Sequence, residues 1–199
     1  MKYVLTTVIG IISFLMLWSV IPTEQECEIY TSTLRLHVVA ASDSERDQSA
    51  KLKVKDAILD RVSEYGASSK SELISLVSAD KEAIEQIALE ALKKEGITDT
   101  VSLEIGQEIY PTREYEGFSL PAGEYTSVRL NIGEAMGQNW WCVLFPPLCT
   151  AQAIEYDDEA FISTGLSKEQ YYMITGNSKE YEIKFKLLEL AANAFGFSE

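Results

Sequence analysis

The first regular pattern along the chain is the run TLRLHVVA, in which Leu34, Leu36 and Val38 alternate with Arg35 and His37. Apolar residues at every second position are typical of a strand that buries one face in a core. The run therefore predicts a half-buried strand that carries Arg35 and His37 on its polar face.

Apolar stripes with helical spacing follow this strand. Ser42 with Glu45, and Ser69 with Glu72, match the capping box, in which a hydroxyl and a carboxylate satisfy backbone amides at the start of a helix. Asp80 begins a third stripe, and a glycine ends the first and the third. The predicted helices cover residues 42–65, 69–77 and 80–96.

Period-two alternation returns at residues 101–109 and 125–132, which predicts two more strands, paired antiparallel. The connection between them, Pro111–Gly123, is too long for a tight hairpin and is partly apolar. Further helices are predicted after residue 167 and over residues 179–195. This order of elements predicts an α+β fold with helices packed on one face of a small mixed β-sheet, whose other face needs cover or a partner.

The N-terminal segment is apolar. Lys2 precedes residues 3–21, which carry no charge, and an acidic stretch follows Pro22. About 19 uncharged residues suit either a signal peptide or a membrane anchor, because roughly 20 apolar helical residues span a bilayer. Lys2 predicts a cytoplasmic N-terminus. The expected organisation is a signal peptide or transmembrane anchor at 1–21, a linker at 22–32 and a single globular domain at 33–199.

Composition limits the chemistry of the chain. Seventeen Lys and Arg against 31 Asp and Glu give a net charge of −14, which argues against a nucleic-acid partner. The sequence has no phosphate-loop, dinucleotide or zinc-protease motif, and its one histidine cannot build a multi-histidine metal site. We therefore expect no cofactor, no metal and no catalytic residue. His37 is then a hydrogen-bonded or interface residue or, alternatively, a general base, and Asp43 and Asp47 either cap a helix or bind a cation.

The most unusual segment is NWWCVLFPPLC, which begins at Asn139. Its proline pair removes backbone donors, so it cannot be a regular interior strand throughout. Trp140 and Trp141 should point to opposite faces of an extended backbone, so one of them is a candidate for partner contact. Cys142 and Cys149 either form a disulfide or remain buried thiols.

Three stretches resemble the stage II sporulation protein R family. They are LRLHVVAASDSERDQSAKLKVKDAI from Leu34, LPAGEYTSVRLNIGEAMGQNWWCVLFPPLC from Leu120 and, more weakly, YEIKFKLLEL from Tyr181. The resemblance implies a protein that is made in the forespore and exported into the space between the two membranes. There it would activate a membrane-embedded aspartic protease of the mother cell, which then matures pro-sigma-E.

The leading hypothesis from the sequence is therefore a secreted, non-enzymatic signalling protein that is either released or held at the membrane by residues 3–21. The alternatives are an exported enzyme of the cell envelope and a structural envelope domain. The partner-binding surface is predicted to comprise Arg35, His37, Asp43, Asp47, Asn139, Trp140 and Trp141.

Overall fold

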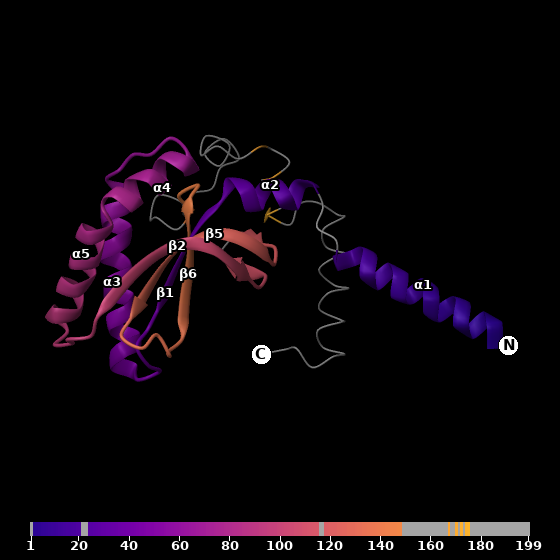
Figure 1. The fold of residues 1–199 in the computed structure, drawn as a ribbon, viewed down its shortest axis with the longest axis horizontal. Helices are drawn as coiled ribbons and strands as arrows, with labels where there is room; N and C mark the ends of the chain where they lie inside the picture. The colour runs from indigo at the N-terminus through magenta and orange to yellow at the C-terminus, as the bar shows by residue number, and fades with distance from the viewer. Residues whose placement is uncertain are drawn as a thin grey trace.

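The computed structural model describes residues 2–20, 24–115 and 118–148, together with positions 167, 170, 172, 174 and 175. Figure 1 shows the arrangement of its helices and strands. In chain order they are α1 Lys2–Val20, α2 Glu24–Ser32, β1 Leu34–Val39, α3 Glu45–Ser63, α4 Lys70–Ala79, α5 Lys81–Lys94, β2 Val101–Tyr110, β3 Arg113–Tyr115, β4 Phe118–Leu120, β5 Gly123–Ile132 and β6 Asn139–Phe145.

A mixed four-stranded sheet organises the domain. Its strand order is β2-β5-β1-β6, so β1 is central and β2 and β6 form the edges. β1 runs parallel to β5 and antiparallel to β6, and β2 pairs antiparallel with β5. The predicted α+β class with a mixed sheet is confirmed, as is the antiparallel pairing of the second and third predicted strands.

Helices α3, α4 and α5 lie together on one side of this sheet (Figure 1). The core on this side unites Leu34, Leu36 and Val38 of β1 with apolar residues of α3 and α5, including Val54 and Ile84. Burial of these side chains, each worth about 1.5–3 kcal/mol, drives the helices onto the sheet. The alternating apolar residues of β1 therefore form the core face of the strand, as the sequence predicts.

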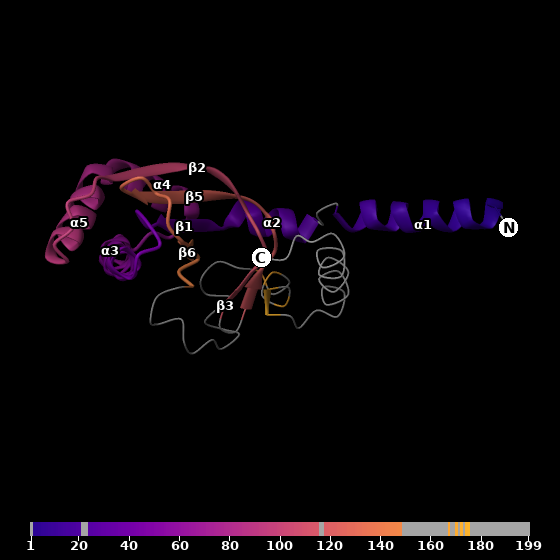
Figure 2. The ribbon, with the colours of Figure 1, turned by 90° about the horizontal axis from the view of Figure 1, so that it is seen from below.

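The opposite side of the sheet is also covered, which corrects the prediction of a half-buried first strand. All six residues of β1 are buried, including Arg35 and His37. The cover comes from Ile29 of α2 and from the β3–β4 hairpin, whose Phe118 joins Tyr110 and Tyr125 in a second core. Figure 2 shows β3 and α2 on the side of the sheet away from α3 and α5.

Helix caps agree with the sequence only in part. Ser44, not Ser42, caps α3 and accepts a hydrogen bond from the backbone amide of Asp47, so the predicted start of that helix was wrong. Ser69 caps α4 as predicted, although the carboxylate of Glu72 accepts from the backbone of Ser68. Gly66 and Gly96 adopt positive φ after α3 and α5, in the left-handed region that favours glycine.

Residues before β1 form two helices. The segment predicted as a linker contains α2, which contacts β5 and buries Ile29. No helix among the described residues, α1 included, is long and apolar enough to cross a membrane. The signal or anchor role of residues 1–21 therefore stays a prediction. The helix predicted to start at Ser167 is confirmed in its first turn, because the amide of Gln170 donates to the hydroxyl of Ser167, the amide of Ser167 donates to the side chain of Gln170, and positions 170, 172 and 174 are helical. The helix predicted over 179–195 lies outside the described segments.

The turn after β1 packs tightly against the β5–β6 loop, where the amide of Gly137 donates to the carbonyl of Ala40. A Cβ at Gly137 would collide with the carbonyl oxygen of Ser42, whereas a Cβ at Gly106 meets no atom within 4 Å. We expect Gly137→Ala to destabilise the fold by about 2 kcal/mol or more. The matched control Gly106→Ala should stay within about 0.5 kcal/mol. Urea unfolding measures both, and equal losses would contradict this account.

Candidate functional site

The face of the sheet opposite α3 and α5 carries a cluster of charged, polar and aromatic side chains, here called the aromatic face. Strand register places Arg35 beside Ser127 and Val143, and His37 beside Arg129 and Trp141. Since paired residues share a side of the sheet, these side chains belong to one surface. The aromatic face comprises Arg35, His37, Glu108, Tyr110, Tyr125, Ser127, Arg129 and Trp141.

Arg35 lies at the centre of this face and is 0% exposed. The carbon of its guanidinium is 3.9 Å from the ring centre of Tyr110 and 4.9 Å from that of Tyr125. Its Nη2 donates to the hydroxyl of Tyr115, on β3, at 2.6 Å. Its Nε and Nη1 have no hydrogen-bond partner within the part of the chain that the structure describes. The two rings favour the cation, but the edge of the guanidinium is only partly satisfied.

The three tyrosines around Arg35 do not supply a negative charge. Burial raises the pKa of Tyr110, Tyr115 and Tyr125, and this outweighs the lowering effect of the Arg35 charge. All three phenols are therefore neutral at physiological pH. Arg61 and Arg129 form ion pairs with carboxylates, but no such pair to Arg35 occurs among the described residues.

His37 joins the edges of the sheet through a polar network. Its Nδ1 lies 3.2 Å from a carboxylate oxygen of Glu108, and its Nε2 lies 2.8 Å from Oδ1 of Asn139. Both neighbours are acceptors, so the ring can donate to both only when both nitrogens carry protons. Arg129 donates to the other oxygen of Glu108 at 2.9 Å. Glu108 and His37 together thus link β1, β2, β5 and β6.

Glu108 is the acidic centre of this network. Burial alone would raise its pKa, but the hydrogen bond from Ser127, the charge of His37 and the hydrogen bond from Arg129 together lower the pKa below its usual value. The carboxylate is consequently ionised at neutral pH, as the pairing with His37 and Arg129 requires.

Trp140 and Trp141 point to opposite faces of the sheet, as the sequence predicts. Trp140 packs against the core on the helical side, where the ammonium of Lys55 lies 5.0 Å from its ring centre. Trp141 lies on the aromatic face, 5.2 Å from His37 and 5.1 Å from Tyr110 between ring centres. Arg113 of β3 covers Trp141, and the indole nitrogen of Trp141 is buried without a partner in the described segments.

Asp43 and Asp47 lie apart from the aromatic face, in the turn between β1 and α3. Asp43 accepts from the backbone amide of Gln138 at 2.8 Å, and Asp47 accepts from the hydroxyl of Ser42 at 2.5 Å. Lys51, on α3, donates to the carbonyl of Gln138. These contacts join α3 to the start of β6, so both aspartates support the position of Asn139.

The predicted partner-binding residues therefore fall into three groups. Arg35, His37, Asn139 and Trp141 meet at the aromatic face, Trp140 lies on the helical side, and the two aspartates hold the intervening turn. Cys142 is buried on β6. Cys149 lies outside the described residues, so the disulfide between them stays a prediction.

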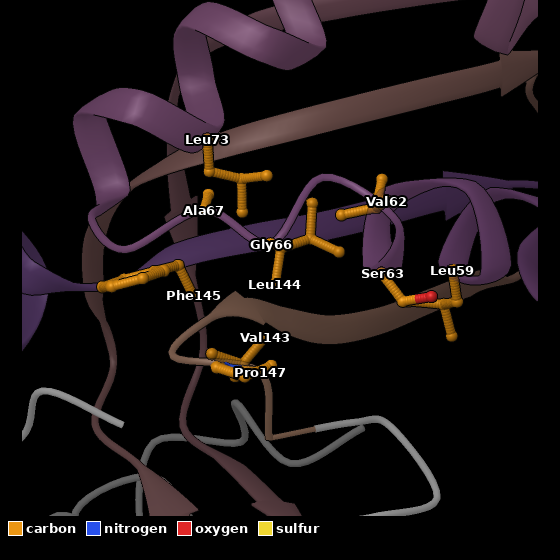
Figure 3. Close-up of a pocket in the computed structure, with 10 residues that line it drawn as sticks. All are labelled: Leu59, Val62, Ser63, Gly66, Ala67, Leu73, Val143, Leu144, Phe145 and Pro147. Atoms are coloured by element: carbon orange, nitrogen blue, oxygen red, sulfur yellow. The ribbon is translucent and has the colours of Figure 1, made fainter. Parts of the chain in front are cut away.

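Among the hollows along the described segments are two that are lined by several residues of the sheet. One of about 260 Å³ lies beside Glu108 and is lined also by Ser127, Arg129 and Glu104. The other, of about 170 Å³, lies between the end of α3, the start of α4 and the end of β6. Figure 3 shows its mostly apolar lining, with Leu73 and Val62 on one side and Val143 and Pro147 on the other.

The chemistry available on the aromatic face is recognition. The pair of Glu108 and His37 resembles half of a catalytic triad, but Nε2 of His37 faces an amide oxygen where a nucleophile would have to lie. No group of three or more histidine, cysteine, aspartate or glutamate side chains suited to a metal occurs among the residues that the structure describes.

Sequence reasoning did not find Glu108, Tyr110, Tyr125 or Ser127 as members of the site. A signal was present, because alternation over residues 101–110 places Glu108 and Tyr110 on one side of a strand. Their meeting with Arg35 depends on strand order, which alternation does not encode. Tyr115 belongs to the long connection Pro111–Gly123 predicted between two strands, and in the structure it is part of a hairpin that reaches Arg35.

Comparison with known proteins agrees with the sequence resemblance. A family model described as Stage II sporulation protein R matches residues 30–155. Stage II sporulation protein R of Bacillus subtilis (strain 168) is 28% identical over 190 residues, which are 86% of this chain and 85% of that protein. No solved structure matches the chain. The chain belongs to the stage II sporulation protein R family, whose members are sporulation signalling proteins and not enzymes.

We expect Glu108→Gln to destabilise the domain by about 2 kcal/mol near neutral pH, because the change leaves His37 and Arg129 facing an uncharged partner. A lowered folded-state pKa means that Glu108 stabilises the fold above its unfolded-state pKa, and that this stability is lost as pH falls through the folded-state value. The gap between variant and wild type should therefore close on acidification. Urea unfolding over a pH series measures it.

The exposed Glu104, on the same strand, provides a matched control. Glu104→Gln should change the free energy of unfolding by no more than about 0.5 kcal/mol at any pH. A gap for Glu108→Gln that persists unchanged into acid would show that its charge does not stabilise the fold.

Proposed function

We propose that this chain is an exported signal of sporulation. It is made in the forespore, acts in the space between the two cells, and activates a membrane-embedded aspartic protease that matures pro-sigma-E. Residues 3–21 direct export and either anchor the chain or are removed. The proposal extends membership of the family, which by itself gives a signalling role in sporulation.

The proposal is supported by the range of residues that the family model matches. This range begins at residue 30, within α2, and includes β1 to β6, so the shared feature is the folded sheet with its helical core and most of its second core. The N-terminal helix lies before the match. A signal that is carried by the folded domain requires a protein partner that reads its surface.

The start of β6 is the part of the domain best suited to this partner. β6 is an edge strand, and at its start Asn139 is exposed while Trp140 and Trp141 are partly exposed. Partly exposed tryptophans commonly supply much of the binding energy of an interface. Activation further requires that the domain binds the active form of the protease more tightly than the inactive form.

The test is expression of the full chain with the protease and its pro-sigma substrate in a host that does not sporulate. Cleavage of the substrate that depends on the chain is the expected result. If the chain is exported and folded and the substrate is not cleaved, the proposed activation is wrong.

Trp140→Leu tests the contact surface in the same assay, because leucine keeps the apolar packing on the helical side and removes the indole. We expect activation to need roughly 30-fold more of this variant, the equivalent of about 2 kcal/mol. Ile109→Ala is the matched control, since Ile109 is 85% exposed on the opposite edge of the sheet. Equal activity of Trp140→Leu and wild type would exclude Trp140 from the interface.

A further inference from the structure

The aromatic face lacks hydrogen-bond acceptors. Three buried side-chain atoms have no hydrogen-bond partner in the described part of the chain: Nε and Nη1 of Arg35, and Nε1 of Trp141. All three are donors, and both side chains belong to the aromatic face, because Arg35 pairs with Val143 and Trp141 lies two residues before it. Buried donors without acceptors are costly and uncommon in folded proteins. The group that completes this site is therefore an acceptor.

The charge of Arg35 defines that acceptor further. A buried guanidinium is strongly stabilised by a carboxylate, and the surrounding phenols are neutral and supply none. The aromatic face also holds Arg129, and Arg113 lies over it, so three of the five arginines of this acidic chain gather here. We infer that Arg35 is a recognition site for an aspartate or glutamate side chain of a protein partner.

Tyr115 occupies the position that this carboxylate needs. A carboxylate binds a guanidinium with two parallel hydrogen bonds, either to Nε and Nη2 or to Nη1 and Nη2. Both arrangements use Nη2, which donates to the hydroxyl of Tyr115. A carboxylate that binds in either arrangement displaces the Tyr115 hydroxyl from Nη2. Its second hydrogen bond then comes from Nε in one arrangement and from Nη1 in the other, and both atoms lack a partner in the described residues.

Displacement of Tyr115 moves the β3–β4 hairpin. Among the described residues the hairpin pairs only within itself, and it is held to the sheet by Phe118 and Leu120, by the Tyr115 contact with Arg35 and by the Arg113 contact with Trp141. Segments with few buried contacts open more readily than the core of a domain. The hairpin is thus a cover over Arg35, and the incoming carboxylate replaces the phenol that keeps it closed.

The route to Arg35 runs under this cover. The hollow beside Glu108 is lined by two carboxylates, Glu104 and Glu108, against the single cation Arg129, so its net negative charge repels an acidic group. The hairpin side instead carries the guanidinium of Arg113, 3.8 Å from the ring centre of Trp141. The partner's acidic side chain therefore enters beneath β3. This inference rests on the proposed function only in that the partner is a protein.

The Nε–H resonance of Arg35 reports on the site directly. It is measured by nitrogen–proton NMR on the full chain in detergent micelles and assigned by its loss in Arg35→Lys. Addition of N-acetyl-aspartate N-methylamide, which carries a side-chain carboxylate, should shift this resonance in a saturable manner. The amides of β3 and β4 should exchange with solvent faster when the probe is bound.

Tyr115→Phe removes the competing hydroxyl and should lower the dissociation constant of the probe about tenfold, since one hydrogen bond no longer has to be broken. Tyr65→Phe is the matched control, because the Tyr65 hydroxyl binds Asp80 away from this face. Its dissociation constant should equal that of wild type. No saturable shift in Tyr115→Phe, at probe concentrations up to roughly 0.1 M, would overturn the inference.

Two further experiments test whether the carboxylate comes from a chain terminus or from this chain itself. Tighter binding of N-acetylglycine, whose carboxylate mimics a chain terminus, would overturn the assignment to a side chain. A variant with Asp157→Asn, Asp158→Asn and Glu159→Gln tests the acidic run of the chain itself, and a shifted Arg35 resonance in this variant without any probe would overturn the assignment to a partner.

The protease assay is independent of these measurements. Probe binding without activation of the protease rejects the proposed function alone, and activation without probe binding rejects this inference alone.

Discussion

A central strand has to be covered on both faces, and most features of this domain follow from the two ways in which β1 is covered. On one face Leu34, Leu36 and Val38 pack against helices in an ordinary apolar core. On the other face the strand presents Arg35 and His37, which cannot be buried without compensation. Tyrosine rings, a carboxylate and a separate hairpin are gathered over these two residues.

The two faces differ in how much of each can be predicted from sequence. The helical side follows from periodicity: a strand with alternating apolar residues is succeeded by amphipathic helices, and their stripes meet in the core. The caps were less predictable, because Ser42 and Ser44 are both plausible first residues of a helix. The observed cap depends on Asp47, which is hydrogen-bonded by Ser42 and whose amide binds Ser44.

The aromatic face could not be predicted in the same way. Arg35 and His37 alternate with apolar residues, and this local pattern alone predicts that they are exposed to solvent. Their burial results from Tyr110, Tyr115 and Trp141, which lie more than 70 positions later in the sequence. The sequence did single out Arg35, His37, Asn139 and Trp141 as functional, and these four residues come together in space. Asp43 and Asp47 were grouped with them because they lie nearby in the sequence, and they hold a turn instead.

The strand order also determines when the domain can fold. β1 is the first strand of the sheet, yet its partners are β5 and β6, so its backbone remains unpaired until residues 123–145 have been synthesised. Sheets closed by such distant pairs form slowly, because a long loop has to be ordered before the pairing stabilises it. The growing chain thus lacks its central sheet while most of its length is being made. Until β6 emerges, α3 and α5 have no complete sheet to pack against, so the domain gains its tertiary structure as one unit late in synthesis.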